Sequence, residues 1–223
     1  MSIDIINELN LEQFRGVFLK YTRKAFQMLP KMDKPRILDI GCGTGLTTIE
    51  LARLSDGEII GIDINQDALD KLNSIIKKKG LSNRIKTMNN SLYKIGFPSS
   101  SFNLLWEEGV LHILDLKKCL KECKRLLIPN GFLVMNESKK WMNKSLDIFP
   151  KYNFKLVDQF LLPEKCWWTE YYAPLEVKIN ELHLKYTKAE DLEKLKQHER
   201  EIEMVKKNPL EFDCGFYIMQ KVN

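Results

Sequence analysis

The stretch that decides the fold runs from residue 36 to residue 45 and reads Arg36-Ile37-Leu38-Asp39-Ile40-Gly41-Cys42-Gly43-Thr44-Gly45. Its first half is a short apolar run, which predicts a buried strand. Its second half places glycine at every other position, and a turn without Cβ atoms lets the backbone approach a ligand closely. The stretch therefore predicts a strand that ends in a ligand-binding turn.

Strands and helices are expected to alternate on the C-terminal side of this turn. Further strands are expected over residues 58–62, 84–88, 102–106 and 132–136, and helices over 44–54, 65–79 and 116–127. Such alternation predicts βαβ units with right-handed connections and helices on both faces. With later strands at 154–162 and 212–220, the sequence predicts an open, doubly wound, mainly parallel seven-stranded α/β sheet.

Two further segments are expected to be helical. Apolar side chains recur at helical intervals over residues 11–29, and residues 174–207 indicate one or two long, charged helices. We therefore expect one domain over residues 1–223: an N-terminal helical segment (1–33), a ligand-binding core (34–137) and a C-terminal part (138–223) with a helical cap (170–208). This segment is the candidate either for a cap or for an oligomer contact, such as that of a homodimer.

Composition excludes several classes of protein. The 35 basic and 30 acidic residues give a net charge of only +5, and the basic residues are dispersed, which disfavours a nucleic-acid partner. No apolar run approaches the roughly 20 residues of a membrane span, and Met1-Ser2-Ile3-Asp4 lacks an export-signal pattern. The five cysteines include no CxxC pair, so we expect neither disulfides nor a metal site, and a cytoplasmic location.

The charges around the glycine turn indicate which ligand it binds. A dinucleotide fingerprint requires glycine where this chain has Leu46, and Asp39 would oppose a pyrophosphate but suits a ligand with an ammonium group. Asp63 ends the next expected strand, where acids bind ribose hydroxyls. The structural alternative is that Asp39 caps the turn and Asp63 caps the helix beginning near Asn65. Both acids together, on either side of three glycines, favour the ligand.

Residues 37–52 closely resemble the first signature motif of class I S-adenosylmethionine-dependent methyltransferases. The resemblance continues through residues 61–65, 97–106 and 125–132, and it covers roughly residues 34–137. The later pairs Trp167-Trp168 and Tyr171-Tyr172 resemble an uncharacterised small-molecule-type subgroup. The resemblance implies an enzyme that binds S-adenosylmethionine and releases S-adenosylhomocysteine.

By this resemblance, the cofactor contacts the ends of the first four strands. The glycines face its methionine part, Asp39 its amino group, and Asp63 its ribose. Many relatives carry an acid where this chain has Ser91, so the adenine contact is expected to use backbone groups and Leu92. The full expected set is Tyr21, Asp39, Gly41, Cys42, Gly43, Thr44, Gly45, Asp63, Ile64, Asn65, Asn90, Ser91, Leu92 and Glu107.

Methyl transfer is an in-line displacement, for which the protein chiefly aligns the reactants and excludes water. A base is needed only when the acceptor arrives protonated. The expected candidates are Glu108 and His112, which follow the fourth strand. The structural alternatives are that Glu108 bonds loop amides and that His112 only begins a helix.

The acceptor is expected to be a small molecule. Motifs for amino-group or pyrimidine C5 methylation of nucleic acids and for protein-arginine methylation are missing from the sequence. An aromatic run could line the acceptor pocket or pack the C-terminal helices onto the sheet: Trp167, Trp168, Tyr171 and Tyr172. Two alternatives stay open, a non-catalytic S-adenosylmethionine-binding scaffold and, less favoured, an RNA or protein methyltransferase.

Overall fold

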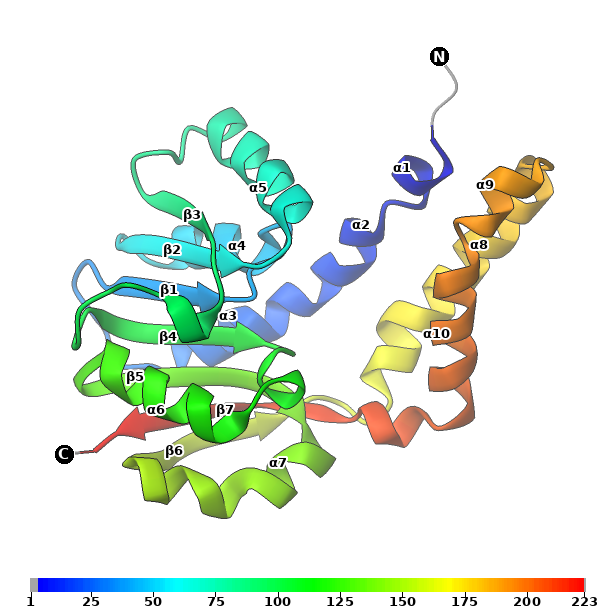
Figure 1. Ribbon diagram of the computed structural model, residues 1–223. Helices are drawn as coiled ribbons and strands as arrows, with labels where there is room; N and C mark the ends of the chain where they lie inside the picture. The colour runs from blue at the N-terminus through cyan, green and yellow to red at the C-terminus, as the bar shows by residue number, and fades with distance from the viewer. Residues whose placement is uncertain (1–3, 223) are drawn as a thin grey trace. The chain divides into compact units, whose positions relative to one another are not determined.

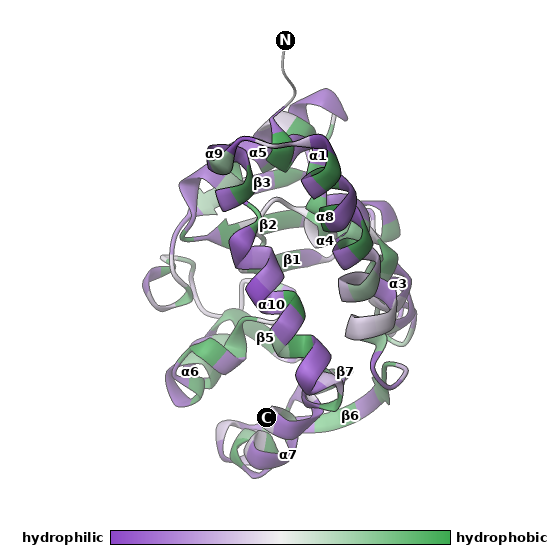
Figure 2. Ribbon diagram, turned by 90° about the vertical axis from the view of Figure 1, so that its right-hand side faces the viewer, coloured by the Kyte–Doolittle hydropathy of each residue, from purple (hydrophilic) through white to green (hydrophobic). Residues whose placement is uncertain are grey.

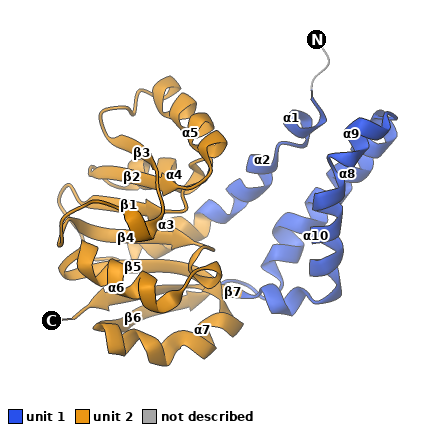
Figure 3. Ribbon diagram, in the orientation of Figure 1, with its two compact units in different colours: residues 1–19, 162–213 blue, residues 20–161, 214–223 orange. Residues whose placement is uncertain are grey.

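The computed structural model describes residues 4–222, which form two compact units (Figure 3). The helical unit comprises the residues up to Leu19 together with Leu162–Asp213, and the sheet unit comprises Lys20–Leu161 and the residues from Cys214. The sequence analysis treats the chain as one domain with helical segments at both ends. In the structure, the first residues and the helical insertion belong to the same unit.

The sheet unit is built on seven strands in the order β3-β2-β1-β4-β5-β7-β6 (Figure 1). They are β1 (Arg36–Ile40), β2 (Glu58–Asp63), β3 (Ile85–Asn89), β4 (Phe102–Glu108), β5 (Leu127–Ser138), β6 (Phe154–Leu161) and β7 (Cys214–Lys221). β7 pairs antiparallel with both of its neighbours, β5 and β6, and the other four strand pairs in the described part of the chain are parallel. The strand order reverses between β1 and β4, where doubly wound folds bind ligands. The expected open, mainly parallel sheet is confirmed.

Helices cover both faces of this sheet. The main ones are α3 (Leu19–Gln27), α4 (Leu46–Leu54), α5 (Gln66–Lys78), α6 (Leu116–Leu126) and α7 (Lys139–Ser145), with the 3₁₀ turns η2 (Leu92–Lys94), η3 (Leu111–Ile113) and η4 (Leu146–Tyr152). Figure 1 shows α6 and α7 in front of the sheet. On β1, Leu38 and Ile40 join the core that includes α6, whereas Asp39 faces α4. This alternation turns one acid of a buried strand toward the helix that follows the glycine turn.

The helical unit has its own apolar core. It contains α1 (Ile5–Leu9), α2 (Leu11–Arg15), η1 (Gly16–Phe18), the π-helix η5 (Trp167–Tyr172), α8 (Ala173–Lys185), α9 (Ala189–Glu193), α10 (Lys196–Lys207) and η6 (Pro209–Phe212). Leu175, Ile179 and Leu182 form the stripe expected on α8, and Ile202 continues the core on α10. Figure 2 shows that the rest of α10 is mainly hydrophilic. This amphipathic pattern explains why charged helices pack together here.

Two expected helices are interrupted in the structure. The helix expected over residues 11–29 contains the 3₁₀ turn η1, which begins at Gly16, a residue that weakens a continuous helix. The segment expected as one or two helices over 174–207 forms α8, α9 and α10, because Tyr186 leaves the helical conformation at the end of α8. Periodicity identified these segments but not the interruptions within them.

Between residues 4 and 222, no helix has both the length and the apolar character that crossing a bilayer requires. The expectation drawn from Met1-Ser2-Ile3-Asp4 rests mainly on residues 1–3, which lie outside the described residues.

The entry into β1 predicts a steric requirement at Gly57. A Cβ built there lies 1.8 Å from the backbone oxygen of Pro35, which precedes β1. We expect Gly57→Ala to lower the free energy of unfolding by about 1–3 kcal/mol, because backbone atoms must shift to remove the overlap. Urea unfolding measures this loss. The matched control is Gly96→Ala, where no atom lies within 4 Å of the added Cβ; equal stabilities of the two variants would contradict the prediction.

Candidate functional site

The turn after β1 adopts a backbone conformation that requires glycine. Gly41, Gly43 and Gly45 have φ angles of +72°, +52° and +88°. A Cβ at Gly41 would lie 2.4 Å from Val110 Cγ2, and one at Gly45 would lie 2.0 Å from Leu72 Cδ1. At Gly43 no protein atom lies within 4 Å of the Cβ position. Two glycines therefore allow close packing, and the middle one leaves its backbone open to a ligand.

Asp63 fastens this turn to the end of β2. Its Oδ2 accepts a hydrogen bond from the Gly43 amide at 2.8 Å, and its Oδ1 accepts one from the Asn65 amide at 2.8 Å. The α5 cap comes from Asn65, whose side chain accepts from the Ala68 amide at 3.1 Å. Asp63 therefore does not provide the capping bond that the structural alternative assigned to it. Each carboxylate oxygen keeps a second lone pair, with which it can accept from a hydroxyl.

Asp39 is a buried acid at the same edge of the sheet. It is only 2% exposed, and its Oδ2 accepts a hydrogen bond from Thr48 Oγ1 at 2.5 Å. Burial raises the pKa of Asp39 to about 7, against the opposing effect of the Thr48 hydrogen bond, and the negative charges of Glu108 and Asp63 raise it further. A cation at this edge would favour the ionised form of Asp39.

Glu108, at the end of β4, bonds to side chains rather than to loop amides. Its Oε1 accepts hydrogen bonds from Trp106 Nε1 at 2.8 Å and from Thr22 Oγ1 at 3.0 Å. Thr22 is fully buried on α3 and is a contact that the sequence analysis missed. Burial raises the pKa of Glu108. A side chain with these two donors is held firmly in place.

Glu107 lies beneath the loop that leaves β4. Its side chain is fully buried, and Oε2 accepts hydrogen bonds from the Val110 amide at 2.9 Å and the Leu111 amide at 3.3 Å. The sequence analysis expected Glu107 to contact the cofactor. Because its carboxyl group is directed into the protein, any effect on a ligand must be transmitted through this loop.

His112 and Glu137 form a pair at the ends of neighbouring strands. His112 Nδ1 lies 3.0 Å from Glu137 Oε2, and the His112 amide donates to Glu137 Oε1 at 3.0 Å. The imidazole is 43% exposed, whereas the Glu137 side chain is 2% exposed. The sequence analysis missed Glu137, although this acid directly follows the strand expected over residues 132–136. His112 lies in η3, ahead of α6, rather than at the start of that helix.

Other residues of the expected cofactor set lie along the same edge. Ile64, directly after β2, is 78% exposed, whereas Leu92 is buried and Ser91 caps η2 through Tyr93. Asn90 is tied to the end of β2 by its amide, which donates to the Asp63 carbonyl at 3.1 Å. The remaining members are Tyr21 on α3, half-buried, and Cys42 and Thr44 in the turn. Their cofactor contacts stay predictions.

The aromatic run 167–172 packs within the helical unit. Trp167 stacks on Phe18 at a centroid distance of 4.4 Å, and Tyr171 meets Tyr172 edge-on at 4.7 Å. Tyr171 is buried in the helical core, and Trp168 is half-buried near Lys206, whose Nζ lies 5.6 Å from its ring. These rings stabilise the unit that carries them. Their expected role in binding the acceptor stays a prediction.

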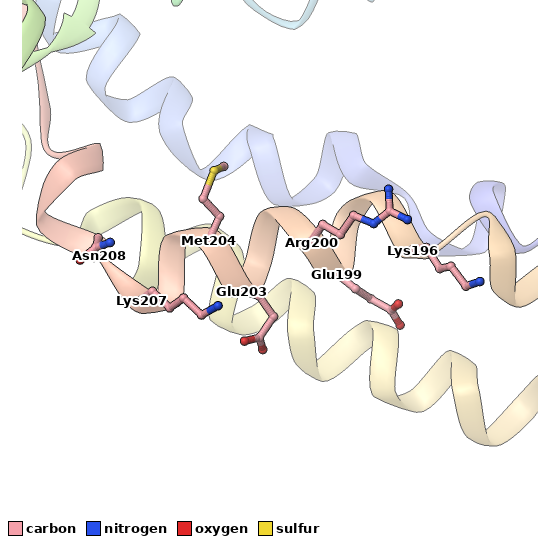
Figure 4. Close-up of a pocket in the computed structure, with 7 residues that line it drawn as sticks. All are labelled: Lys196, Glu199, Arg200, Glu203, Met204, Lys207 and Asn208. Carbon is pink, nitrogen blue, oxygen red and sulfur yellow. The ribbon is translucent and has the colours of Figure 1, made fainter.

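A groove of about 640 Å³ runs along α10 in the helical unit (Figure 4). Its lining residues all come from α10 and the residue after it: Lys196, Glu199, Arg200, Glu203, Met204, Lys207 and Asn208. None of them belongs to the expected cofactor, catalytic or acceptor sets. The groove therefore adds no residue to these expected sites.

Comparison with known proteins matches the sheet unit to one family. Residues 38–135 match the family described as Methyltransferase domain. The chain is 32% identical over 127 residues to an uncharacterised methyltransferase of Schizosaccharomyces pombe, covering 54% of this chain and 42% of that protein. It is 28% identical over 119 residues to 27-O-demethylrifamycin SV methyltransferase of Amycolatopsis mediterranei, covering 53% and 44%. The chain thus spans less than half the length of either relative.

The fold also matches solved structures. The crystal structure of the 4+2 cyclase SpnF superposes with a TM-score of 0.75 at 18% identity and covers 91% of this chain and 81% of that one. A likeness at this identity shows the fold alone.

The sheet order and the glycine turn define a doubly wound α/β protein whose candidate ligand site lies at the β1–β4 switch point. Over residues 38–135 the chain matches the methyltransferase-domain family, and this part of the chain resembles the class I S-adenosylmethionine-dependent methyltransferases.

The burial of Asp39 predicts an unusual pH dependence of stability. Its pKa is 3.8 in the unfolded chain and about 7 in the fold, so the folded state holds a proton that the unfolded state has lost. Stability of the ligand-free protein therefore falls as pH rises from about 4 to 7, with a slope of up to about 1.4 kcal/mol per pH unit. Carboxyl groups with lowered pKa values, such as Glu58, have the opposite effect, but only around and below their unfolded-chain pKa of 4.5, so the fall in stability is clearest above pH 5.

Urea unfolding at pH 5, 6, 7 and 8 measures this dependence. Asp39→Asn should make the profile less steep, because asparagine can still accept the Thr48 hydrogen bond but does not titrate. The slope that remains comes from Glu107, Glu108 and Glu137, whose pKa values burial also raises. A wild-type stability that is constant or rises between pH 5 and 8 would show that Asp39 is ionised in the folded protein.

Proposed function

We propose that this chain transfers a methyl group from S-adenosylmethionine to a small-molecule acceptor. The observation that carries the proposal is the turn of three positive-φ glycines fastened by Asp63, with the acids Asp39 and Glu108 beside it. The family match and the relative named 27-O-demethylrifamycin SV methyltransferase support the reaction and the acceptor class.

The charge at the edge of the sheet fits this cofactor. S-adenosylmethionine carries a sulfonium and an ammonium group, and cations are stabilised beside carboxylates. Asp39 and Asp63 interact electrostatically in the structure, so a bound cation would relieve their repulsion. A bound pyrophosphate, which is negatively charged, would instead increase the electrostatic repulsion at this edge. Asp63 would hold the ribose hydroxyls, and the open backbone at Gly43 would accommodate the methionine part.

His112 is the base that we assign to acceptors bearing a protonated nucleophile. When bound, the cofactor supplies a methyl group whose bond to sulfur breaks, with the electron pair passing to sulfur, as the acceptor's lone pair forms the new bond. Glu137 faces Nδ1 of His112, so Nε2 is the nitrogen left to take the acceptor's proton. Glu108, held by Trp106 and Thr22, is the second candidate.

A non-catalytic cofactor-binding scaffold is the alternative, because the glycine turn and Asp63 would bind the cofactor whether or not methyl transfer follows. An RNA or protein acceptor is disfavoured by the dispersed positive charge. Within residues 4–222 the five cysteines are buried and no disulfide joins them, which supports a reducing, cytoplasmic location. A homodimer stays a prediction.

Methyl-labelled S-adenosylmethionine tests the function directly. The protein is incubated with host-cell extract, which is then separated into small-molecule, protein and RNA fractions. We expect label only in the small-molecule fraction, and at least a tenfold loss with Asp63→Ala, which removes the ribose contact and the bond to the turn. The matched control, Asp67→Ala on the exposed first turn of α5, should label normally.

The fraction that carries the label decides between the alternatives. Label in RNA or protein would overturn the acceptor class but not the cofactor. Absence of label from an extract that contains the acceptor, with S-adenosylhomocysteine bound normally, would favour the non-catalytic role.

Replacing His112 tests the base. We expect His112→Ala to lower kcat by about 100-fold or more, the usual contribution of a general base, and to leave the Kd for S-adenosylhomocysteine unchanged. His183→Ala is the matched control, because His183 also pairs with a glutamate, Glu199, but lies on α8 in the helical unit. Equal rates for the two variants would remove His112 from the mechanism.

A further inference from the structure

Two buried carboxyl groups hold the loop between β4 and α6 from below. Glu107 accepts from the Val110 and Leu111 amides, and Glu137 accepts from the His112 amide. Three successive backbone amides are thus bonded to two acids from neighbouring strands. These bonds fix the direction in which the short turn η3 presents the His112 ring.

The carboxyl groups of Glu107 and Glu137 lie in a buried site and interact electrostatically. Glu107 is fully buried and Glu137 is 2% exposed, and each affects the other's ionisation. Burial raises the pKa of both groups, and the charge of Glu137 raises that of Glu107 further. The other titratable groups that interact with this pair are Glu108 on β4, His112 on η3, Cys119 and Cys123 on α6, and Tyr217 on β7. Apart from an imidazolium at His112, no cation is among them, so one negative charge is the arrangement that the pair favours.

The contacts decide which acid keeps the proton. Glu137 receives the His112 amide, and the ring nitrogen Nδ1 lies against both its oxygens, at 3.0 and 3.3 Å. A carboxylate only accepts, so an ionised Glu137 requires hydrogen on Nδ1. Glu107 Oε1, in contrast, is buried without a hydrogen-bond partner among the described residues. An ionised oxygen without a donor is costly, so the proton belongs on Glu107.

We propose that Glu107 is a positioning residue for His112: a neutral carboxylic acid that fixes the Val110–Leu111 amides and leaves the single negative charge of the pair on Glu137. His112 is thereby held as the Nδ1–H tautomer, with Nε2 free to accept a proton. The inference rests on the proposed function only in naming His112 as the base. The tautomer itself is a property of the resting protein.

Nitrogen-15 NMR of the three histidines reads this tautomer without turnover, with His112→Gln used to assign the signal. The spectra are recorded above the imidazole titration in protein saturated with S-adenosylhomocysteine. We expect wild-type protein and Glu107→Gln to show predominantly the Nδ1–H form, because glutamine is neutral and its oxygen can accept the same two amides. Glu107→Ala and Glu137→Gln should shift His112 toward the Nε2–H form that free imidazole favours.

Rate measurements use the extract fraction that accepts label. Glu107→Gln should stay within about threefold of wild type, whereas Glu107→Ala should lose at least tenfold in kcat, with the Kd for S-adenosylhomocysteine unchanged. Leu120→Ala, which shortens a buried side chain of the same core that has no hydrogen-bonding group, controls for lost stability and should leave the tautomer unaltered.

The outcomes separate the two proposals. If Glu107→Gln shifts the His112 tautomer equilibrium toward the Nε2–H form as far as Glu107→Ala does, Glu107 is ionised in the wild-type protein and the inference is wrong. If wild-type His112 is already in the Nε2–H form, the inference is also wrong. If the tautomers follow the expectation but no fraction is methylated, the positioning role stands and the proposed function fails.

Discussion

Mutual repulsion among carboxyl groups is the constraint on which the rest of the site depends. Four acids end up buried or nearly buried where parallel strands terminate: Asp39, Glu107, Glu108 and Glu137. A carboxyl group can be buried only if hydrogen-bond donors or a nearby cation stabilise its negative charge, or if it keeps its proton. Donors come from Thr48, from loop amides and from Trp106. The arrangement therefore limits the stability of the free protein and favours a positively charged ligand.

The fold was largely predictable because its signals are local. The apolar run before Gly41 and the regular alternation after it specify strands, helices and their parallel order, since right-handed connections leave few arrangements. The placing of Asp39 and Asp63 at one edge of the sheet could be predicted for the same reason, because Asp63 ends β2 and Asp39 is the last residue but one of β1. Strand ends meet at one edge of a parallel sheet, so sequence position translates directly into spatial position there.

The remaining contacts depend on side-chain direction and on distant segments. Glu107 and Glu108 are adjacent in sequence, but the pleat of β4 sends one beneath the loop and the other toward α3. Thr22 meets Glu108 across 86 positions of chain, and a threonine within a helix carries no signal of such a partner. The first residues and Leu162–Asp213 belong to one unit. Local periodicity likewise does not predict that these two distant segments pack together.

The position of β7 has a consequence for how the chain acquires its structure. This strand is the last element in sequence, yet it lies between β5 and β6, and it forms the only strand contacts of β6 within the described residues. During synthesis, β6 must wait for more than fifty residues of intervening chain, including the whole helical insertion, before it can join the sheet. Pairings of such long separation form slowly. The insertion that carries the aromatic run thus also delays closure of the sheet, and the nascent chain meanwhile exposes a β5 edge that needs protection from other strands.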